Sequence, residues 1–109
     1  MTPIFNHIYT GRYPESATDP IFAQWVSKQM KSKQDITNFL VVMRFGNRHL
    51  NLGDVSTGKI KHIIDGLYPL VGGMPGRPDD WRISAMAVEK GSRDLLPQSI
   101  SVTVWEADV

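Results

Sequence analysis

Acidic and basic side chains occur in three short stretches of the chain, in a pattern that suits phosphate chemistry. Asp54 comes first, Lys61 and Asp65 follow four residues apart, and Asp79-Asp80 come after a loop. Carboxylates that gather in one place repel one another unless a cation or a proton intervenes. Mg²⁺ takes oxygen ligands and is commonly held by one or two carboxylates together with a substrate phosphate. If folding brings the three stretches together, these residue types predict a magnesium site with a lysine beside it.

The chemistry expected of such a site is phosphodiester hydrolysis. A bound metal polarises the phosphodiester and lowers the pKa of an attacking water. Lys61 would stabilise the negative charge that develops on phosphorus and on the leaving oxygen. The same residues also have an ordinary interpretation: Asp54 caps a helix, Lys61–Asp65 is a surface ion pair worth about 0.2–0.5 kcal/mol, and Asp79-Asp80 belong to a turn.

The elements that must position these residues can be predicted from the apolar pattern. Aromatic and β-branched residues predict a strand at 4–9, and apolar residues at helical spacing after Asp19-Pro20 predict a helix that ends near Lys31. The run at 39–45 is apolar on both faces, which is typical of an interior strand. A second helix is predicted from about Ser56 to Leu67, with Ser56 or Thr57 as its cap.

The second half of the chain is predicted to be mostly strand. The Gly- and Pro-rich segment 71–78 predicts a long turn without regular structure. Strands follow at 82–89 and 99–106, and the segment between them predicts a hairpin connection. The order of elements indicates an α+β fold in which two helices pack on one face of a small mixed β-sheet.

Length and composition fit one globular domain over residues 1–109. The chain has 109 residues, of which 41% are hydrophobic and 21% charged, and it has no cysteine. A disulfide framework and a thiolate metal site are therefore excluded. We find neither an apolar run as long as a membrane span nor a secretion signal, so we expect a cytoplasmic protein.

The motifs resemble those of the RusA family of Holliday junction resolvases, which are small dimeric endonucleases of phages and bacteria. The family pattern is Asp-x-Asp-Asn near a helix start, then Lys, then Asp four residues later followed by a small residue and Leu, and Asp-Asp after a loop. The resemblance covers about residues 20 to 107. It is carried by Lys61-His-Ile-Ile-Asp65-Gly-Leu67, Asp79-Asp80-Trp-Arg-Ile83 and Val88-Glu-Lys90-Gly91.

The resemblance implies an endonuclease, dependent on Mg²⁺ or Mn²⁺, that cleaves branched DNA in recombination and repair as a homodimer. Residue by residue, it implies that Asp54, Asp79 and Asp80 hold the metal. It further implies that Lys61 stabilises charge and that Asp65 orients Lys61.

The chain departs from the family pattern just before the second helix. Counted back from Lys61, the paired acids of the family fall on Val55 and Thr57. If one residue is inserted there, Asp54 takes the first acid position, Ser56 the second, and Thr57 that of the asparagine. Hydroxyls carry no charge, so metal affinity should fall. The alternative hypothesis is a catalytically impaired RusA-like domain that binds DNA or protein, and a purely structural interaction domain is a third.

Charge and aromatic residues bear on DNA binding. Between Arg44 and Arg93 there are eight Lys or Arg against five acids, a local balance of +3. This excess suits a basic surface around an acidic centre, and an ordinary mixed surface is the alternative. We expect Lys59, Arg77 and Arg82 to contact DNA.

Trp81 either stacks on a base or packs against its loop. The three histidines (His7, His49 and His62) lack metal-ligand spacing and are expected at the surface.

Overall fold

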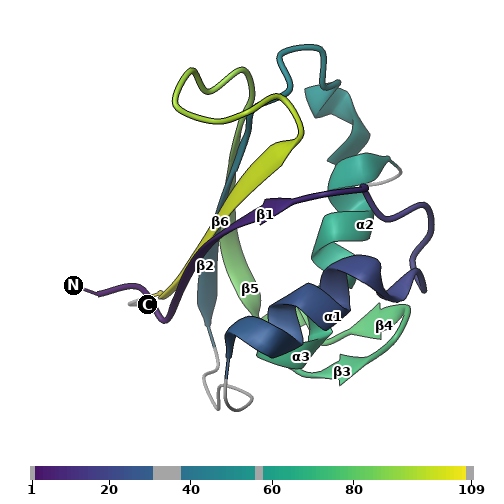
Figure 1. Cartoon of the computed structure of the whole chain (residues 1–109). Helices are drawn as coiled ribbons and strands as arrows, with labels where there is room; N and C mark the ends of the chain where they lie inside the picture. The colour runs from purple at the N-terminus through teal and green to yellow at the C-terminus, as the bar shows by residue number, and fades with distance from the viewer. Residues whose placement is uncertain (1, 31–37, 56–57, 108–109) are drawn as a thin grey trace.

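A mixed β-sheet forms one layer of the protein, and helices cover one of its faces (Figure 1). The computed structural model describes residues 2–30, 38–55 and 58–107. Within them, the strands of the main sheet lie in the order β1 (Phe5–Thr10), β6 (Ser99–Glu106), β2 (Phe39–Phe45) and β5 (Ile83–Glu89). β6 is antiparallel to both of its neighbours, whereas β2 and β5 run parallel. The predicted mixed sheet is confirmed.

The hydrophobic core lies between this sheet and the helices. Along β2, alternate residues from Phe39 to Phe45 are fully buried, and the residues between them are half-exposed. This alternation is what a strand with only one covered face requires. On β6 the buried apolar positions are Ile100, Val102 and Val104.

The helices that cover the sheet are α1 (Pro20–Gln29), α2 (Lys59–Asp65) and the short α3 (Tyr68–Val71). The predicted start of α1 is confirmed: Asp19 Oδ1 accepts a hydrogen bond from the backbone N–H of Ile21 at 3.1 Å, and Pro20 occupies the first turn. α2 follows Gly58, which makes no side-chain cap bond. The predicted caps Ser56 and Thr57, and the predicted end of α1 near Lys31, lie outside the described residues.

The connection between β5 and β6 corrects one prediction, because these strands are not neighbours and the segment between them is no hairpin. The chain instead passes the end of β2, where the N–H of Ser92 donates to the Phe45 carbonyl at 3.1 Å and the N–H of Gly46 donates to the Ser99 carbonyl at 3.0 Å. A Cβ on Gly46 would lie 1.9 Å from the Leu96 carbonyl oxygen. Glycine is therefore required at this crossing.

The Gly- and Pro-rich segment 71–78 corrects a second prediction, because it contains a short regular hairpin. β3 (Gly73–Met74) pairs antiparallel with β4 (Arg77–Pro78). Gly73 and Gly76 have φ values of +105° and +77°, a backbone region that glycine enters without a steric penalty. The glycines that argued against regular structure thus make the tight turn possible.

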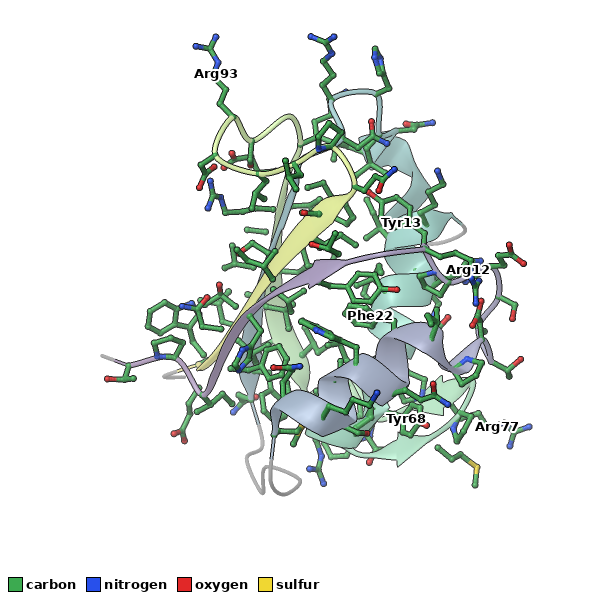
Figure 2. All side chains as sticks on the ribbon, in the orientation of Figure 1. Arg12, Tyr13, Phe22, Tyr68, Arg77 and Arg93 are labelled. Atoms are coloured by element: carbon green, nitrogen blue, oxygen red, sulfur yellow. The ribbon has the colours of Figure 1, made fainter. Side chains whose placement is uncertain are left out.

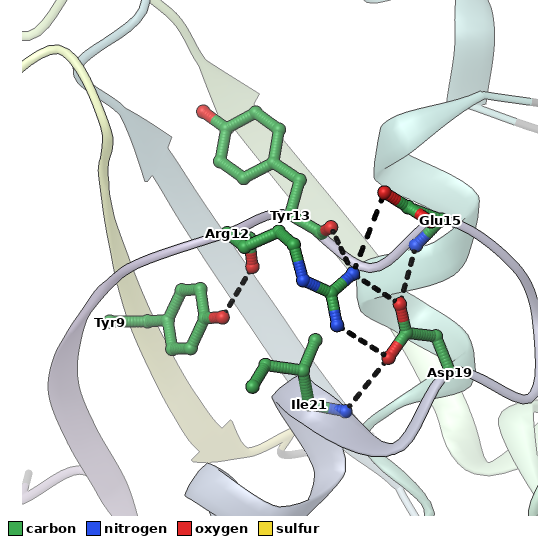
Figure 3. A network of polar contacts seen from close by, with 6 residues as sticks. All are labelled: Tyr9, Arg12, Tyr13, Glu15, Asp19 and Ile21. Carbon is green, nitrogen blue, oxygen red and sulfur yellow. Dashed lines mark hydrogen bonds and ion pairs between the residues drawn. The ribbon is translucent and has the colours of Figure 1, made fainter.

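A bidentate ion pair fixes the loop between β1 and α1 (Figure 3). The two terminal nitrogens of Arg12 lie 2.6 and 3.3 Å from the two carboxylate oxygens of Asp19. Asp19 also accepts backbone hydrogen bonds from Glu15 at 2.9 Å and from Ile21, and the Tyr9 hydroxyl donates to the Arg12 carbonyl. The Arg12 guanidinium, followed by the two backbone donors, holds the pKa of Asp19 well below its usual value.

The depressed pKa of Asp19 predicts a stability that falls in acid. The unfolded chain holds a proton on this carboxyl more tightly, so the stabilisation is complete above the unfolded pKa of about 3.9 and is lost as the pH falls toward the folded pKa. We expect Asp19→Asn, which keeps a capping side chain, to be less stable than the wild type at pH 7, with a difference that shrinks between about pH 5 and pH 2. The midpoints of urea unfolding of the two proteins, taken between about pH 2 and pH 7, measure this difference in stability. Arg12→Gln should behave alike, and a pH-independent difference would contradict the assignment.

Candidate functional site

Lys61 on α2 stands between two carboxylates. Its Nζ lies 2.6 Å from Oδ1 of Asp65, one turn further along the same helix, and 3.9 Å from Oδ2 of Asp80. Asp80 comes from a different segment, the 3₁₀ turn η2 (Asp80–Arg82) that leads into β5. The fold therefore brings together three of the residues that the sequence singles out.

The two carboxylates differ sharply in their access to solvent. The side chain of Asp65 is 2% exposed, whereas those of Asp80 and Lys61 are 51% and 34% exposed. A buried carboxylate is tolerated only when it is paired and hydrogen-bonded, and Lys61 supplies that partner. Asp65 is thus placed to fix the lysine, while Asp80 is open to a ligand that arrives from solvent.

His62, predicted as a surface residue, is 24% exposed and adjoins this pair. Its Nδ1 lies 3.8 Å from Oδ2 of Asp65. Both atoms are buried, and within the described part of the chain neither has a hydrogen-bond partner. The sequence signal for this proximity is the i, i+3 spacing of the two residues on a helix. The His62 side chain also lines a cavity together with residues of the loop after β1.

The remaining predicted metal ligands take up different positions. Asp79 is partly buried, and its backbone N–H donates to the Gly72 carbonyl at 2.8 Å, as a turn residue would. Asp54 belongs to the 3₁₀ turn η1 (Leu52–Val55), and its side chain lies outside the described part, as do Ser56 and Thr57. Among the described residues, no group of three or more His, Cys, Asp or Glu could hold a metal. Mg²⁺ needs few protein ligands, because it keeps waters and takes ligands from a phosphate.

The cations expected to contact DNA lie in unlike surroundings. Arg77 is exposed on β4 (Figure 2). Arg82 is half-buried with its guanidinium carbon 5.2 Å from the centroid of the exposed Trp81 ring, and its Nε and Nη1 atoms are buried without a hydrogen-bond partner in the described residues. Arg77 and Lys59 can therefore meet a ligand directly, whereas Arg82 would have to move.

A cavity of about 810 Å³ opens along the side of α2 that carries Lys59 and His62. Nothing in the sequence predicted it, because its walls come from four separate segments: the loop after β1, the start of α2, and the loops at Asn47 and at Pro97-Gln98. Apolar rings, cations and amides all line it. Such a mixture is typical of a ligand site in this size range.

Comparisons with known proteins leave the family open. No protein-family model, curated protein or solved structure matches the chain. No helix within the described ranges combines the length and the apolar character needed to cross a bilayer.

The Lys61–Asp65 contact predicts a measurable coupling. Lys61→Met keeps an apolar stem but leaves a buried carboxylate without its ammonium, so we expect the free energy of unfolding to fall by about 2–3 kcal/mol. Adding Asp65→Asn removes the unpaired charge, and part of the loss should be recovered. Urea unfolding of the wild type, both single variants and the double variant measures the coupling energy.

Lys28→Met on the exposed side of α1 is the matched control for this cycle. We expect it to change stability by less than about 0.5 kcal/mol. Effects of Lys61→Met and Asp65→Asn that simply add, within about 0.3 kcal/mol, would show that the contact stabilises nothing.

Proposed function

We propose that this protein is a Mg²⁺-dependent endonuclease that cleaves branched DNA, with Holliday junctions as its substrate, in recombination and repair. The observation that carries the proposal is the 3.9 Å approach of Lys61 Nζ to Asp80 Oδ2. Hydrolysis of a phosphodiester needs a carboxylate that can hold a metal and a cation that stabilises developing charge. The motif resemblance to the RusA resolvases supports the choice of branched DNA.

Mg²⁺ or Mn²⁺ would be held by Asp80 and Asp79, with Asp54 as a further ligand. When bound, the ion supplies polarisation of the phosphodiester and activation of water. The half-exposed carboxylate of Asp80 is the donor best placed to take an ion from solvent, whereas the buried Asp65 cannot. The small number of protein ligands is compatible with Mg²⁺, because waters and a phosphate oxygen complete its shell.

Lys61 and Asp65 have distinct roles in this proposal. As water bonds to phosphorus and the bond to the leaving oxygen breaks, negative charge grows on that oxygen. The Lys61 ammonium would stabilise this charge. Asp65 acts as a positioning residue, because its 2.6 Å contact holds the ammonium in one place and its burial keeps that contact away from competing water.

Cleavage of a synthetic four-way junction in Mg²⁺ or Mn²⁺ tests the function. We expect Asp80→Asn to reduce the rate at least about 100-fold, the scale found when one preorganised electrostatic group is removed. Asp94→Asn is the matched control. Asp94 lies in the loop after β5 and is also exposed, but it pairs with Arg44 on β2 and not with Lys61. We expect it to cleave within about twofold of the wild type. No cutting by a folded wild type, with Asp80→Asn indistinguishable from it, would reject the proposal.

The second candidate is a catalytically impaired RusA-like domain that binds DNA or protein. It is favoured by the departure from the family pattern before the second helix, where the chain supplies one carboxylate, Asp54, in place of two. The same experiment separates the two candidates. Junction DNA that is bound but uncut in either metal, with no heat of metal binding in calorimetry, supports the impaired domain.

We also propose a homodimer, in which two sites would act on opposite strands of a junction. The helix-free face of the sheet supports this, because it carries Ile8, which is 58% exposed, together with half-buried Val42 and Trp105. Ile8→Lys should shift the protein from dimer to monomer in sedimentation velocity. Gln24→Lys on the exposed side of α1 is the control and should leave the dimer intact. A wild type that sediments as a monomer at every concentration would refute the dimer.

A further inference from the structure

Tyr13 gives the cavity beside α2 a rigid aromatic wall. Its ring packs edge-on against the fully buried Phe45, with centroids 6.3 Å apart and planes at 89°. Its hydroxyl is buried with no hydrogen-bond partner in the described residues, and burial raises the pKa of this phenol. Pro14 and Pro97 line the same cavity. Three rings of limited freedom therefore offer a surface on which a flat base can pack at a small entropic cost.

Lys59 gives the cavity a cation that is available to an anion. Its Nζ lies over one face of the Tyr13 ring, 5.0 Å from the centroid, and it makes no ion pair with the residues that the structure describes. Arg12 also lines the cavity, but its guanidinium is committed to Asp19. An ammonium held beside an aromatic ring is the pairing that single-stranded nucleic acid meets in its binding grooves.

His62 is the residue that lies both at the cavity and beside the cluster around Lys61. Contacts run from Asp80 to Lys61, from Lys61 to Asp65, and from Asp65 to His62, whose side chain lines the cavity. Lys59 and His62 are three residues apart and share one side of α2.

We propose that this cavity is a subsite for one nucleotide of a single DNA strand, in which the Lys59 ammonium turns from the Tyr13 ring to a phosphate and the base packs on the ring face that it leaves. The amides of Asn47 and Gln98, which also line it, can hydrogen-bond to the edge of the base. A volume of about 810 Å³ leaves room for a nucleotide unit. The choice of a DNA strand rests on the proposed nuclease function, whereas the binding of a nucleotide does not require cleavage.

Binding of a labelled twelve-residue oligothymidylate, measured by fluorescence anisotropy in EDTA, tests the subsite without any metal chemistry. Lys59→Gln should weaken binding about three- to tenfold. It should also make the slope of log affinity against log salt concentration shallower by about one, which corresponds to one phosphate contact. Lys28→Gln, an equal change of charge on α1, should stay within about twofold. Tyr13→Leu should weaken binding at least about fivefold through lost stacking, and Tyr13→Phe should restore it. Folding of each variant is checked by circular dichroism, and Lys59→Gln alters only an exposed side chain.

The outcomes separate this inference from the proposed function. Equal binding by the wild type, Lys59→Gln and Tyr13→Leu overturns the subsite even if junctions are cleaved. Binding that depends on Lys59 and Tyr13 supports it even if no junction is cut. Thymidine monophosphate serves as the competing probe: displacement of the oligonucleotide only at far higher concentration supports a strand. If thymidine monophosphate binds as tightly as the oligonucleotide, the cavity binds a free nucleotide and the proposal of a DNA strand is rejected.

Discussion

The burial of one negative charge governs the arrangement of the candidate site. Asp65 ends a short helix whose other buried residues, Ile60, Ile63 and Ile64, anchor it in the core. Docking of these isoleucines carries the carboxylate inward with them, since all four lie on seven consecutive residues. An unpaired carboxylate there would cost several kcal/mol, so the Lys61 ammonium is drawn to it at 2.6 Å. The direction in which Lys61 points is thus a consequence of core packing.

The topology of the sheet then decides what meets that lysine. β2 and β5 are parallel neighbours, and parallel strands cannot be joined by a tight hairpin. The chain between them must cross over the sheet, and this crossover contains α2, α3 and the β3–β4 hairpin. Asp80 stands where the crossover ends and β5 begins. Because one connection contains both Lys61 and Asp80, their approach follows from the parallel pairing of the strands on either side of it.

Sequence patterns predicted the elements well where local chemistry determines them. The apolar run at 39–45 gave β2 its observed bounds, Asp19-Pro20 marked the start of α1, and the four-residue spacing of Lys61 and Asp65 anticipated their contact. Strand order was missed, because the insertion of β6 between β1 and β2 depends on contacts between segments far apart in the sequence. The burial of Asp65 and of the His62 Nδ1 atom was missed for the same reason. No local pattern reveals which loop covers a helix surface.

The loop between β1 and α1 links the N-terminal segment to the site. Arg12 and Asp19 close it into a fixed shape, and residues 11–15 of the loop form one wall of the cavity beside Lys59. Asp19 and Asp65 also line a second, much smaller cavity of about 40 Å³, so the anchored end of the loop lies next to the buried carboxylate. Release of the loop would open the small cavity beside Asp65 to water, and the Lys61–Asp65 contact would weaken as the local dielectric rose. An ion pair that touches neither Lys61 nor Asp80 therefore helps to set the strength of the interaction on which both depend.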